Sequence, residues 1–297
     1  MEKRGVSRRR ACTLLGLSRR WRGYQSKRKE RDMIDTLKDL ARRYPRFGYR
    51  RLHQMLLRQG ERVNVKRVRR LCALSGLKLP IRKRRKRRGM GVKTPIIAEY
   101  PNHVWAYDFL FDWCEQGRQL KFLTIEDEYT RECLAIEVDH RMAARQVCQA
   151  LERLMNKRGV PAFVRSDNGP EFIAKALKRM LAVKGTVCRH IDPGSPWQNG
   201  KNERFNGIFR DECANMETFH HRDHARALCR LFVKYYNQER PHSSLGYLTP
   251  EEFARRHPPA AAGYVDSSSQ APAPAAAGGC RNVPAGVSPP KGTIHSL

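Results

Sequence analysis

The chain has 297 residues and a formal net charge of +30, and hydrophobic residues make up 40% of it. That hydrophobic content is ordinary for a globular protein, and the length allows about two domains of roughly 100–200 residues. No run of about 18 apolar residues occurs, and the N-terminus reads MEKR. We therefore expect neither a membrane span nor a secretory signal.

The positive charge is concentrated in the first third of the chain. Residues 1–93 contain 33 Lys or Arg against 6 Asp or Glu, a net charge of +27, whereas residues 94–297 contain 26 against 23, a net charge of +3. A segment charged to this degree repels itself unless a polyanion neutralises it. Nucleic acid is the expected partner, because each phosphate that a protein neutralises releases counterions.

Nine cysteines are present, and no two of them are spaced as Cys-x-x-Cys. The odd number and the apolar surroundings predict reduced thiols and not a disulfide framework. A zinc site formed by Cys213 with His220, His221 and His224 is the alternative for one of them. That spacing does not match a known zinc finger.

Residues 1–93 are expected to be a helical DNA-binding region. In residues 6–24, Ser7 can cap the first of two short helices whose spacing is typical of a helix-turn-helix, although an ordinary helical hairpin fits as well. Residues 30–80 show three helical repeats of apolar residues. Asn64 is expected to cap the third helix, and Gly76 is expected to end it.

Two basic segments are the candidate DNA contacts. The outward positions of the third helix carry Arg62, Lys66, Arg67, Arg69 and Arg70, a distribution that suits a phosphate-lined groove. Residues 82–88 read RKRRKRR and include Arg84, Arg85 and Lys86. Seven like charges cannot pack together, so this segment is predicted to be an exposed linker that clamps DNA between two domains. A nuclear import signal is the alternative interpretation.

The pattern changes to strands after residue 98. Aromatic residues alternate with others over residues 104–113, which predicts a half-buried strand. Strands at 120–126 and 132–138 would continue it as a meander, and helices and strands then alternate. This order predicts an α/β domain over residues 98–255, with a mixed sheet covered by helices. The expected later elements are helices at 142–157, 172–180, 198–214 and 223–237, and strands at 162–166 and 186–191.

Residues 256–297 are rich in Pro, Ala, Gly and Ser. They offer little apolar surface to bury, so this tail is predicted to be disordered.

Three acidic residues are expected to lie near one another in the α/β domain. Asp108 is in the middle of the first strand, Asp167 follows the fourth strand, and Glu203 lies in the helix after the fifth. Hard cations such as Mg²⁺ or Mn²⁺ take oxygen ligands, and two such ions can activate the attacking oxygen and stabilise the leaving oxygen at a phosphodiester. The three acids are therefore candidate catalytic and metal-binding residues.

Four long motifs resemble those of integrase-type transposases, and most closely the second-frame proteins (OrfB) of the insertion-sequence family numbered three. They are WAYD at 105–108, SDNGPEF at 166–172, SPWQNGKNERFNG at 195–207 and YNQERPHSSLG at 236–246. The resemblance extends over residues 6 to 255. It implies a ribonuclease H-like fold and the signature of two aspartates, a gap of 35 residues and a glutamate.

The resemblance also implies an activity and partners. The activity is metal-dependent strand cleavage at the ends of an insertion sequence, followed by strand transfer into target DNA. The implied partners are the terminal repeats, the target DNA, further copies of the chain, and a first-frame protein encoded upstream. In many relatives a basic residue follows the glutamate by seven positions, and Arg210 holds that place. The expected location is the bacterial cytoplasm, on the nucleoid.

Several other residues have a functional interpretation beside a structural one. Asp112 lies on the same face of the strand as Asp108 and is the alternative metal ligand, whereas Asp127 is expected to cap a turn. Trp197 is expected either to stack on a base or to anchor its loop. Arg240 and His242 are expected either to contact phosphate or to shape the turn at Pro241. Asn168 with Gly169 is expected either to form only a turn or to shape the metal site as well, whereas Glu171 and Glu212 are expected to be surface acids of helices.

Two other functions would fit part of this pattern. A DNA-binding regulator without catalytic activity would not need the three acids, and a general nuclease would cut without preference for element ends. The residues alone imply nuclease-like chemistry, and strand transfer comes from the resemblance.

Overall fold

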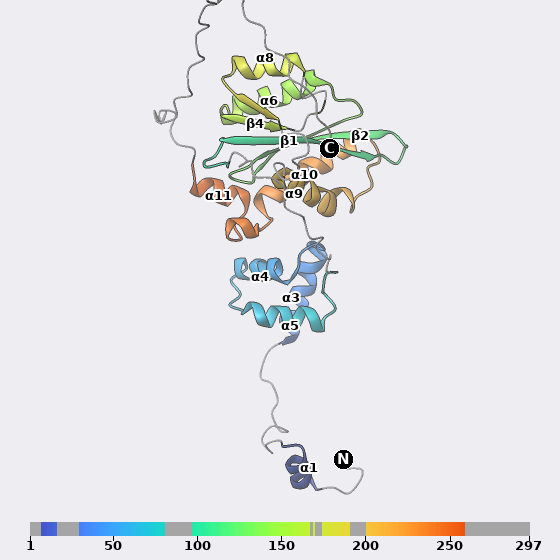
Figure 1. The fold of residues 1–297 in the computed structure, drawn as a ribbon. Coiled ribbons are helices and arrows are strands. Elements are labelled where there is room, and N and C mark those ends of the chain that lie inside the picture. The colour runs from blue at the N-terminus through green and yellow to red at the C-terminus, as the bar shows by residue number, and fades with distance from the viewer. Residues whose placement is uncertain are drawn as a thin grey trace, which may run out of the picture. The chain divides into compact units, whose positions relative to one another are not determined.

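The computed structural model describes residues 7–16, 30–80, 97–166, 169, 174–190 and 200–258. Within these ranges a short helix and a group of three helices precede a five-stranded α/β domain. Figure 1 shows the three-helix group and the sheet with its covering helices. The segment 81–96, with Arg84, Arg85 and Lys86, lies outside the described residues, as do 17–29 and 259–297.

The N-terminal helices begin and end where the sequence predicts. Helix α1 spans Arg8–Leu14, and Ser7 caps it by accepting a hydrogen bond from Arg10 N at 3.4 Å. Helix α5 begins after Asn64, whose side chain accepts from Lys66 N at 2.8 Å. Gly76 has a φ of 70°, a conformation that glycine adopts without steric cost, just after that helix.

Helices α3, α4 and α5 form a small bundle with its own core. They span Glu30–Arg43, Tyr49–Arg58 and Val65–Leu74. Each is amphipathic, and their apolar faces bury residues that include Leu37, Leu52 and Leu71. Tyr235 of the α/β domain packs against the same cluster.

The sheet has the strand order β3-β2-β1-β4-β5. Strands β1 (Val104–Trp113), β2 (Gln119–Asp127) and β3 (Cys133–Asp139) form an antiparallel meander. Strands β4 (Phe163–Ser166) and β5 (Val187–His190) then add in parallel beside β1. The predicted mixed sheet with covering helices is confirmed.

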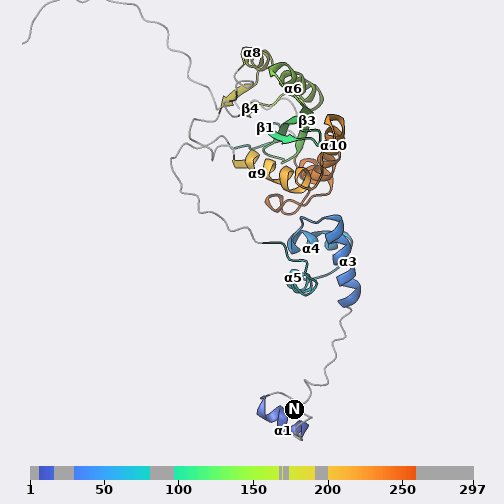
Figure 2. The ribbon, with the colours of Figure 1, turned by 90° about the vertical axis from the view of Figure 1, so that its right-hand side faces the viewer.

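Helices cover both faces of the sheet (Figures 1 and 2). On one side lie α6 (Ala144–Arg158) and α8 (Lys175–Val183). On the other lie α9 (Gly200–Phe209), which continues into the π-helical turn η3 (Arg210–Ala214), and α10 (Arg222–Gln238). The short 3-10 turn η4 (Ser243–Leu245) and α11 (Pro250–Arg256) follow.

The prediction that β1 is half-buried is wrong. Trp105 and Tyr107 are fully buried in the cluster under α6 and α8, and Ala106 and Leu110 are buried on the opposite face, where Leu110 joins the cluster under α9 and α10. The strand is central in the sheet and is covered on both sides. The alternation of aromatic and other residues therefore reflects two different cores, and not one buried face and one solvent-exposed face. Only its far end, at Phe111 and Trp113, is exposed.

Candidate active site

Asp108 lies where strand β1 meets helix α9. Its carboxylate accepts a hydrogen bond at Oδ2 from Asn206 Nδ2 at 2.8 Å, and at Oδ1 from the backbone N of Phe109 at 2.8 Å. Thr124, opposite Asp108 in β2, donates to Asn206 Oδ1 at 3.1 Å and so orients the amide. Two neighbouring elements therefore hold this carboxylate in one orientation.

Glu203 is brought towards the same place by helix α9. It lies in the first turn of that helix, three residues before Asn206, and residues three apart are neighbours on a helix surface. Asn206 is buried against the sheet, whereas Glu203 is exposed. The exposed Glu203 thus lies about one helical turn from Asn206, the residue of α9 that contacts Asp108.

The third predicted acid, Asp167, lies outside the described residues. So do Asn168, Glu171 and Trp197. Strand β4, which ends at Ser166, immediately precedes Asp167 and pairs in parallel with β1, with Arg165 opposite Ala106. The predicted role of Asp167 stays a prediction.

Asp112, the alternative ligand, is farther along β1. It pairs with Leu120 near the hairpin, and its Oδ1 accepts from the backbone N of Trp113 at 2.8 Å. Four residues separate it from Asp108, or about 13 Å at the usual rise of an extended strand. Asn206 contacts Asp108, so α9 meets the strand at that residue.

A buried polar cluster near Asp108 was not anticipated from the sequence. Glu128, with 2% of its surface exposed, accepts from Arg165 Nη1 at 2.6 Å and lies 3.2 Å from Lys201 Nζ. This cluster joins the end of β2 to β4 and to the start of α9. The alternation of residues along β2 predicts that Glu126 and Glu128 lie on the same face as Thr124. It does not predict that they are buried.

Glu126 is the most deeply placed acid of this cluster. Only 1% of its surface is exposed, and its Oε1 has no hydrogen-bond partner within the described part of the chain. Burial raises its pKa to about 8, and the nearby charge of Arg131 opposes that rise only in part. Near neutral pH this side chain is therefore largely protonated.

Asp127 has the turn-capping role that its sequence position predicts. Its Oδ1 accepts from the backbone N atoms of Tyr129 at 2.8 Å and Thr130 at 3.1 Å, and its Oδ2 accepts from Asn102 N at 2.7 Å. With three backbone donors, this buried carboxylate holds the turn between β2 and β3 and the segment that leads into β1.

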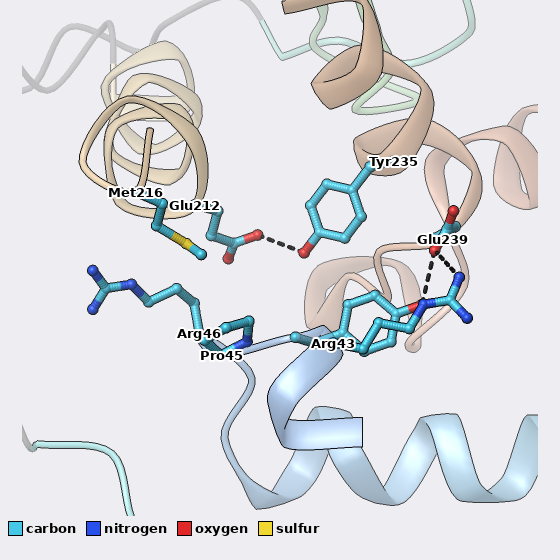
Figure 3. Close-up of a pocket in the computed structure, with 8 residues that line it drawn as sticks. Arg43, Pro45, Arg46, Glu212, Met216, Tyr235 and Glu239 are labelled. Carbon is cyan, nitrogen blue, oxygen red and sulfur yellow. Dashed lines mark hydrogen bonds and ion pairs between the residues drawn. The ribbon is translucent and has the colours of Figure 1, made fainter. Parts of the chain in front are cut away.

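The prediction that Glu212 is a surface residue is wrong. Its side chain is 5% exposed and accepts from Arg240 Nε at 2.7 Å, from Arg240 Nη2 at 2.8 Å, and from Arg51 Nη1 at 2.8 Å. Tyr235 donates its hydroxyl to the same carboxylate at 3.0 Å (Figure 3). These partners come from 23 to 161 residues away along the chain, so a helical pattern read locally could not reveal them.

Arg240 and His242 have structural roles. Arg240 is 2% exposed and its guanidinium is bound to Glu212 by two nitrogens. Burial lowers the pKa of His242 to about 2, with the charges of Arg240 and Arg51 adding to the effect, so its ring is neutral. Neither side chain is exposed to phosphate in this arrangement.

An open pocket of about 320 Å³ lies beside this network. Figure 3 shows Arg43, Pro45 and Arg46 on one side of it and Glu212, Tyr235 and Glu239 on the other. Glu239 Oε2 accepts from Arg43 at 3.1 Å and from the Tyr44 hydroxyl at 2.8 Å. The acids on the wall belong to the α/β domain, and the arginines belong to the end of α3 and the segment after it.

The predicted DNA contacts on α5 differ in their exposure and in the side chains that they contact. Lys66 and Arg69 are exposed, and the guanidinium of Arg69 lies 5.9 Å from the ring centre of Tyr49. Arg70 forms an ion pair with Glu30 at 2.6 Å, and Arg67 is partly buried. Arg210, like Glu203, is exposed. Their contacts with DNA stay predictions.

The described residues contain no group of three or more His, Cys, Asp or Glu side chains arranged to hold a metal ion. That statement covers Cys213, which is buried, and His220, which pairs with Glu115 at 2.6 Å. It does not cover Asp167. Eight cysteines are described, and all of them are free thiols. None of the described helices is long and apolar enough to cross a membrane.

Family comparisons cover nearly the whole described chain. The integrase core domain matches residues 98–196 and again 184–250, and an HTH-like domain matches residues 27–85. The insertion element IS407 uncharacterized 31.7 kDa protein of Burkholderia multivorans is 43% identical over 260 residues, which are 86% of this chain and 93% of that protein. The chain belongs to the insertion-sequence transposases with an integrase core.

Two weaker similarities, one in sequence and one in structure, are also found. Transposase InsF for insertion sequence IS3A of Escherichia coli is 26% identical over 235 residues, covering 75% of this chain and 81% of that protein. The HTLV-2 integrase catalytic core domain, solved in complex with magnesium, is 16% identical with a TM-score of 0.41, covering 52% of this chain and 97% of that one. The HTH-like match includes α3, α4 and α5, whereas the helix-turn-helix spacing noted in the sequence was at residues 6–24.

Proposed function

We propose that this transposase cleaves DNA at the ends of its element and transfers the freed 3′ end, using Asp108, Asp167 and Glu203 as the catalytic residues. The observation that carries the proposal is the hydrogen bond between Asn206 and Asp108, 2.8 Å long, which brings the helix of Glu203 onto the central strand. Asp108 and Glu203, far apart in sequence, thus belong to two elements that are in contact.

The pairing of β4 with β1 supports the inclusion of Asp167. Ala106 lies opposite Arg165 in this parallel pair. Asp108 and Asp167 each follow these paired residues by two positions, and parallel strands advance at the same rate per residue. The spacing of 35 residues between Asp167 and Glu203 is that of the family signature.

The donor set fits divalent metal ions. Integrase-core proteins depend on metal, and three carboxylates are the oxygen ligands that Mg²⁺ or Mn²⁺ prefers. We propose two ions, which when bound would supply the charge that activates the attacking oxygen and stabilises the leaving oxygen. The chain's own part is positional: Asn206 and Thr124 hold the Asp108 carboxylate in one orientation, and α9 carries both Asn206 and Glu203.

We divide the chain into a DNA-binding region at 1–93, a catalytic domain at 98–255 and a tail at 256–297. The charge of +27 on residues 1–93 supports this division, because DNA affinity grows with the number of phosphates neutralised. The proposed contacts there are Lys66, Arg67, Arg69 and Arg70 of α5 and Arg84, Arg85 and Lys86 of the basic segment. Arg210, beside the site, is the proposed contact of the catalytic domain.

The proposed partners follow from the reaction. Terminal repeats and target DNA must be held together, and we propose that several copies of the chain assemble on them. We also propose that a first-frame protein from the same element acts with this chain or is fused to it. We propose that the reaction takes place on the nucleoid of a bacterial cell.

A nicking assay separates this function from its two alternatives. Duplex DNA carrying the element's ends, and the same DNA with the ends shuffled, would be incubated with the full chain and Mg²⁺ or Mn²⁺, with and without a chelator. We expect metal-dependent cuts at the end sequence only. Binding without cuts would favour the DNA-binding regulator, and equal cutting of both DNAs would favour a general nuclease.

A further inference from the structure

The helix that carries Glu203 does not end at the active site. It continues from α9 into the π-helical turn η3, where Glu212 lies nine residues after Glu203. At about 1.5 Å per helical residue the two carboxylates are roughly 13 Å apart along one continuous helix. A contact that fixes Glu212 therefore acts on the same rigid element as Glu203.

One of the groups that fix Glu212 comes from the helical region. Arg51, in α4, donates to Glu212 Oε1 at 2.8 Å, while Arg240 of the catalytic domain binds the same carboxylate with two nitrogens. Arg51 is itself held from behind, with its guanidinium 5.2 Å from the ring centre of Phe47. Arg51 thus links the HTH-like helices to the helix that carries Glu203.

This contact favours the charge of Glu212 but not that of Arg51, whose pKa is lowered by burial and by the nearby charge of Arg240. Burial opposes ionisation of Glu212, but the hydrogen bonds and charge of Arg240, together with the charge of Arg51, outweigh it and lower the pKa of Glu212. Breaking the contact between a buried carboxylate and a charged donor is costly, because the loss of one partner leaves a buried charge without compensation. Arg240 binds Glu212 with two nitrogens of its own, so the carboxylate keeps a charged partner when Arg51 is replaced.

Two further acids of the catalytic domain, Glu239 and Glu252, contact the helical region. Glu239 accepts hydrogen bonds from Arg43 and Tyr44. Glu252 accepts from two nitrogens of Arg58 at 2.6 and 2.9 Å. Tyr44 and Phe47 stack with ring centres 4.8 Å apart, and Tyr235 lies 6.1 Å from Tyr44. Three arginines of the basic helical region, Arg43, Arg51 and Arg58, are thereby paired with acids of the catalytic domain.

We propose that Arg51 is a positioning residue that couples the HTH-like helices to Glu203 through Glu212. The inference rests on the proposed function, because it assigns the position of Glu203 to catalysis. Binding of a DNA end by the helical region would act on the third acid through this contact. Arg51 touches no reacting atom, and its effect passes along the helix from Glu212.

The test compares two neighbouring arginines of α4 in the full chain. Arg51→Gln removes the contact with Glu212 and leaves the pair of Arg240 and Glu212 intact. Arg50→Gln is the matched control, because Arg50 is exposed, carries the same charge, and interacts with Tyr49 and Tyr247 and not with Glu212. Both variants lose one positive charge, so a general loss of DNA attraction affects both alike.

Two readouts are measured, the first without DNA. Amide hydrogen exchange over residues 200–214 should be several-fold faster in Arg51→Gln than in wild type and unchanged in Arg50→Gln. In single-turnover cleavage at saturating DNA, Arg51→Gln should be about tenfold slower and need more Mn²⁺, because small displacements of a catalytic group are costly. Arg51→Lys should recover part of both effects, and it replaces Arg51→Gln if that variant melts below the assay temperature.

Two results would overturn the coupling. One is exchange over residues 200–214 that is equal in Arg51→Gln and Arg50→Gln. The other is a loss of end affinity in Arg51→Gln with cleavage unchanged at saturating DNA, which would make Arg51 a phosphate contact. If wild type cuts no DNA with any divalent metal, the proposed function fails, and the exchange comparison still decides whether Arg51 fixes the helix of Glu203.

Discussion

Asn206 donates a hydrogen bond to Asp108 at 2.8 Å and joins the helix of Glu203 to the central strand of the sheet. The same amide accepts from Thr124 at 3.1 Å, so its orientation is determined. The asparagine amide can donate to the Asp108 carboxylate and at the same time accept from the Thr124 hydroxyl.

Replacement of Asn206 should therefore impair cleavage more than stability. Asn206→Ala removes the donor to Asp108, and Asn206→Asp places a second negative charge against that carboxylate. We expect single-turnover cleavage to fall by about ten- to a hundredfold in both, with a higher Mg²⁺ requirement in the alanine variant. Equal rates in wild type and Asn206→Ala over a full Mg²⁺ titration would show that Asn206 does not position Asp108.

The raised pKa of Glu126 predicts a pH-dependent stability. Because burial raises this pKa from 4.5 to about 8, the free energy of unfolding falls as the pH rises through that window. Glu126→Gln removes the titration, so its advantage in unfolding free energy should widen with pH by up to about 1.4 kcal/mol per unit. Denaturant unfolding of both proteins at pH 5, 6.5 and 8 measures the gap, and parallel pH curves would contradict the assignment.

The two neighbouring arginines in the middle of α5, Arg69 and Arg70, should differ in their effect on DNA binding. Arg70 already pairs with Glu30 at 2.6 Å, whereas Arg69 is exposed beside Tyr49. Arg69→Gln should lower affinity for end DNA more than Arg70→Gln and reduce the slope of log affinity against log salt by about 0.9 if one phosphate contact is lost. Titrations at several salt concentrations measure both, and a larger effect of Arg70→Gln would reverse the assignment of the exposed face.

The comparison of sequence and structure separates local signals from distant ones. Asn64 and Asp127 were predicted correctly, because a cap and a turn depend on neighbours within three residues. The burial of β1 on both faces was missed, because alternating residues look alike whether the second face meets water or another helix. Glu212 was misjudged because its partner Arg51 is 161 residues away.

The candidate site shows the same division. The positions of Asp108 and Glu203 in a strand and a helix could be predicted from periodicity and motif, and the structure has them there. The bond from Asn206 and the buried group of Glu126, Glu128 and Arg165 depend on how α9 packs on the sheet, which no pattern along the chain specifies.

Cleavage of end-containing DNA by single-charge variants tests the central claim most directly. Asp108→Asn, Asp167→Asn and Glu203→Gln each keep the size of the side chain and remove one carboxylate from the metal ligands. Asp112→Asn is the matched control on the same strand. We predict that the first three abolish cleavage and strand transfer while end binding stays within about twofold of wild type, and that Asp112→Asn stays active. Cleavage that survives in all three variants would contradict the enzyme assignment, and loss of activity in Asp112→Asn with retention in Asp108→Asn would show that the site lies elsewhere on β1.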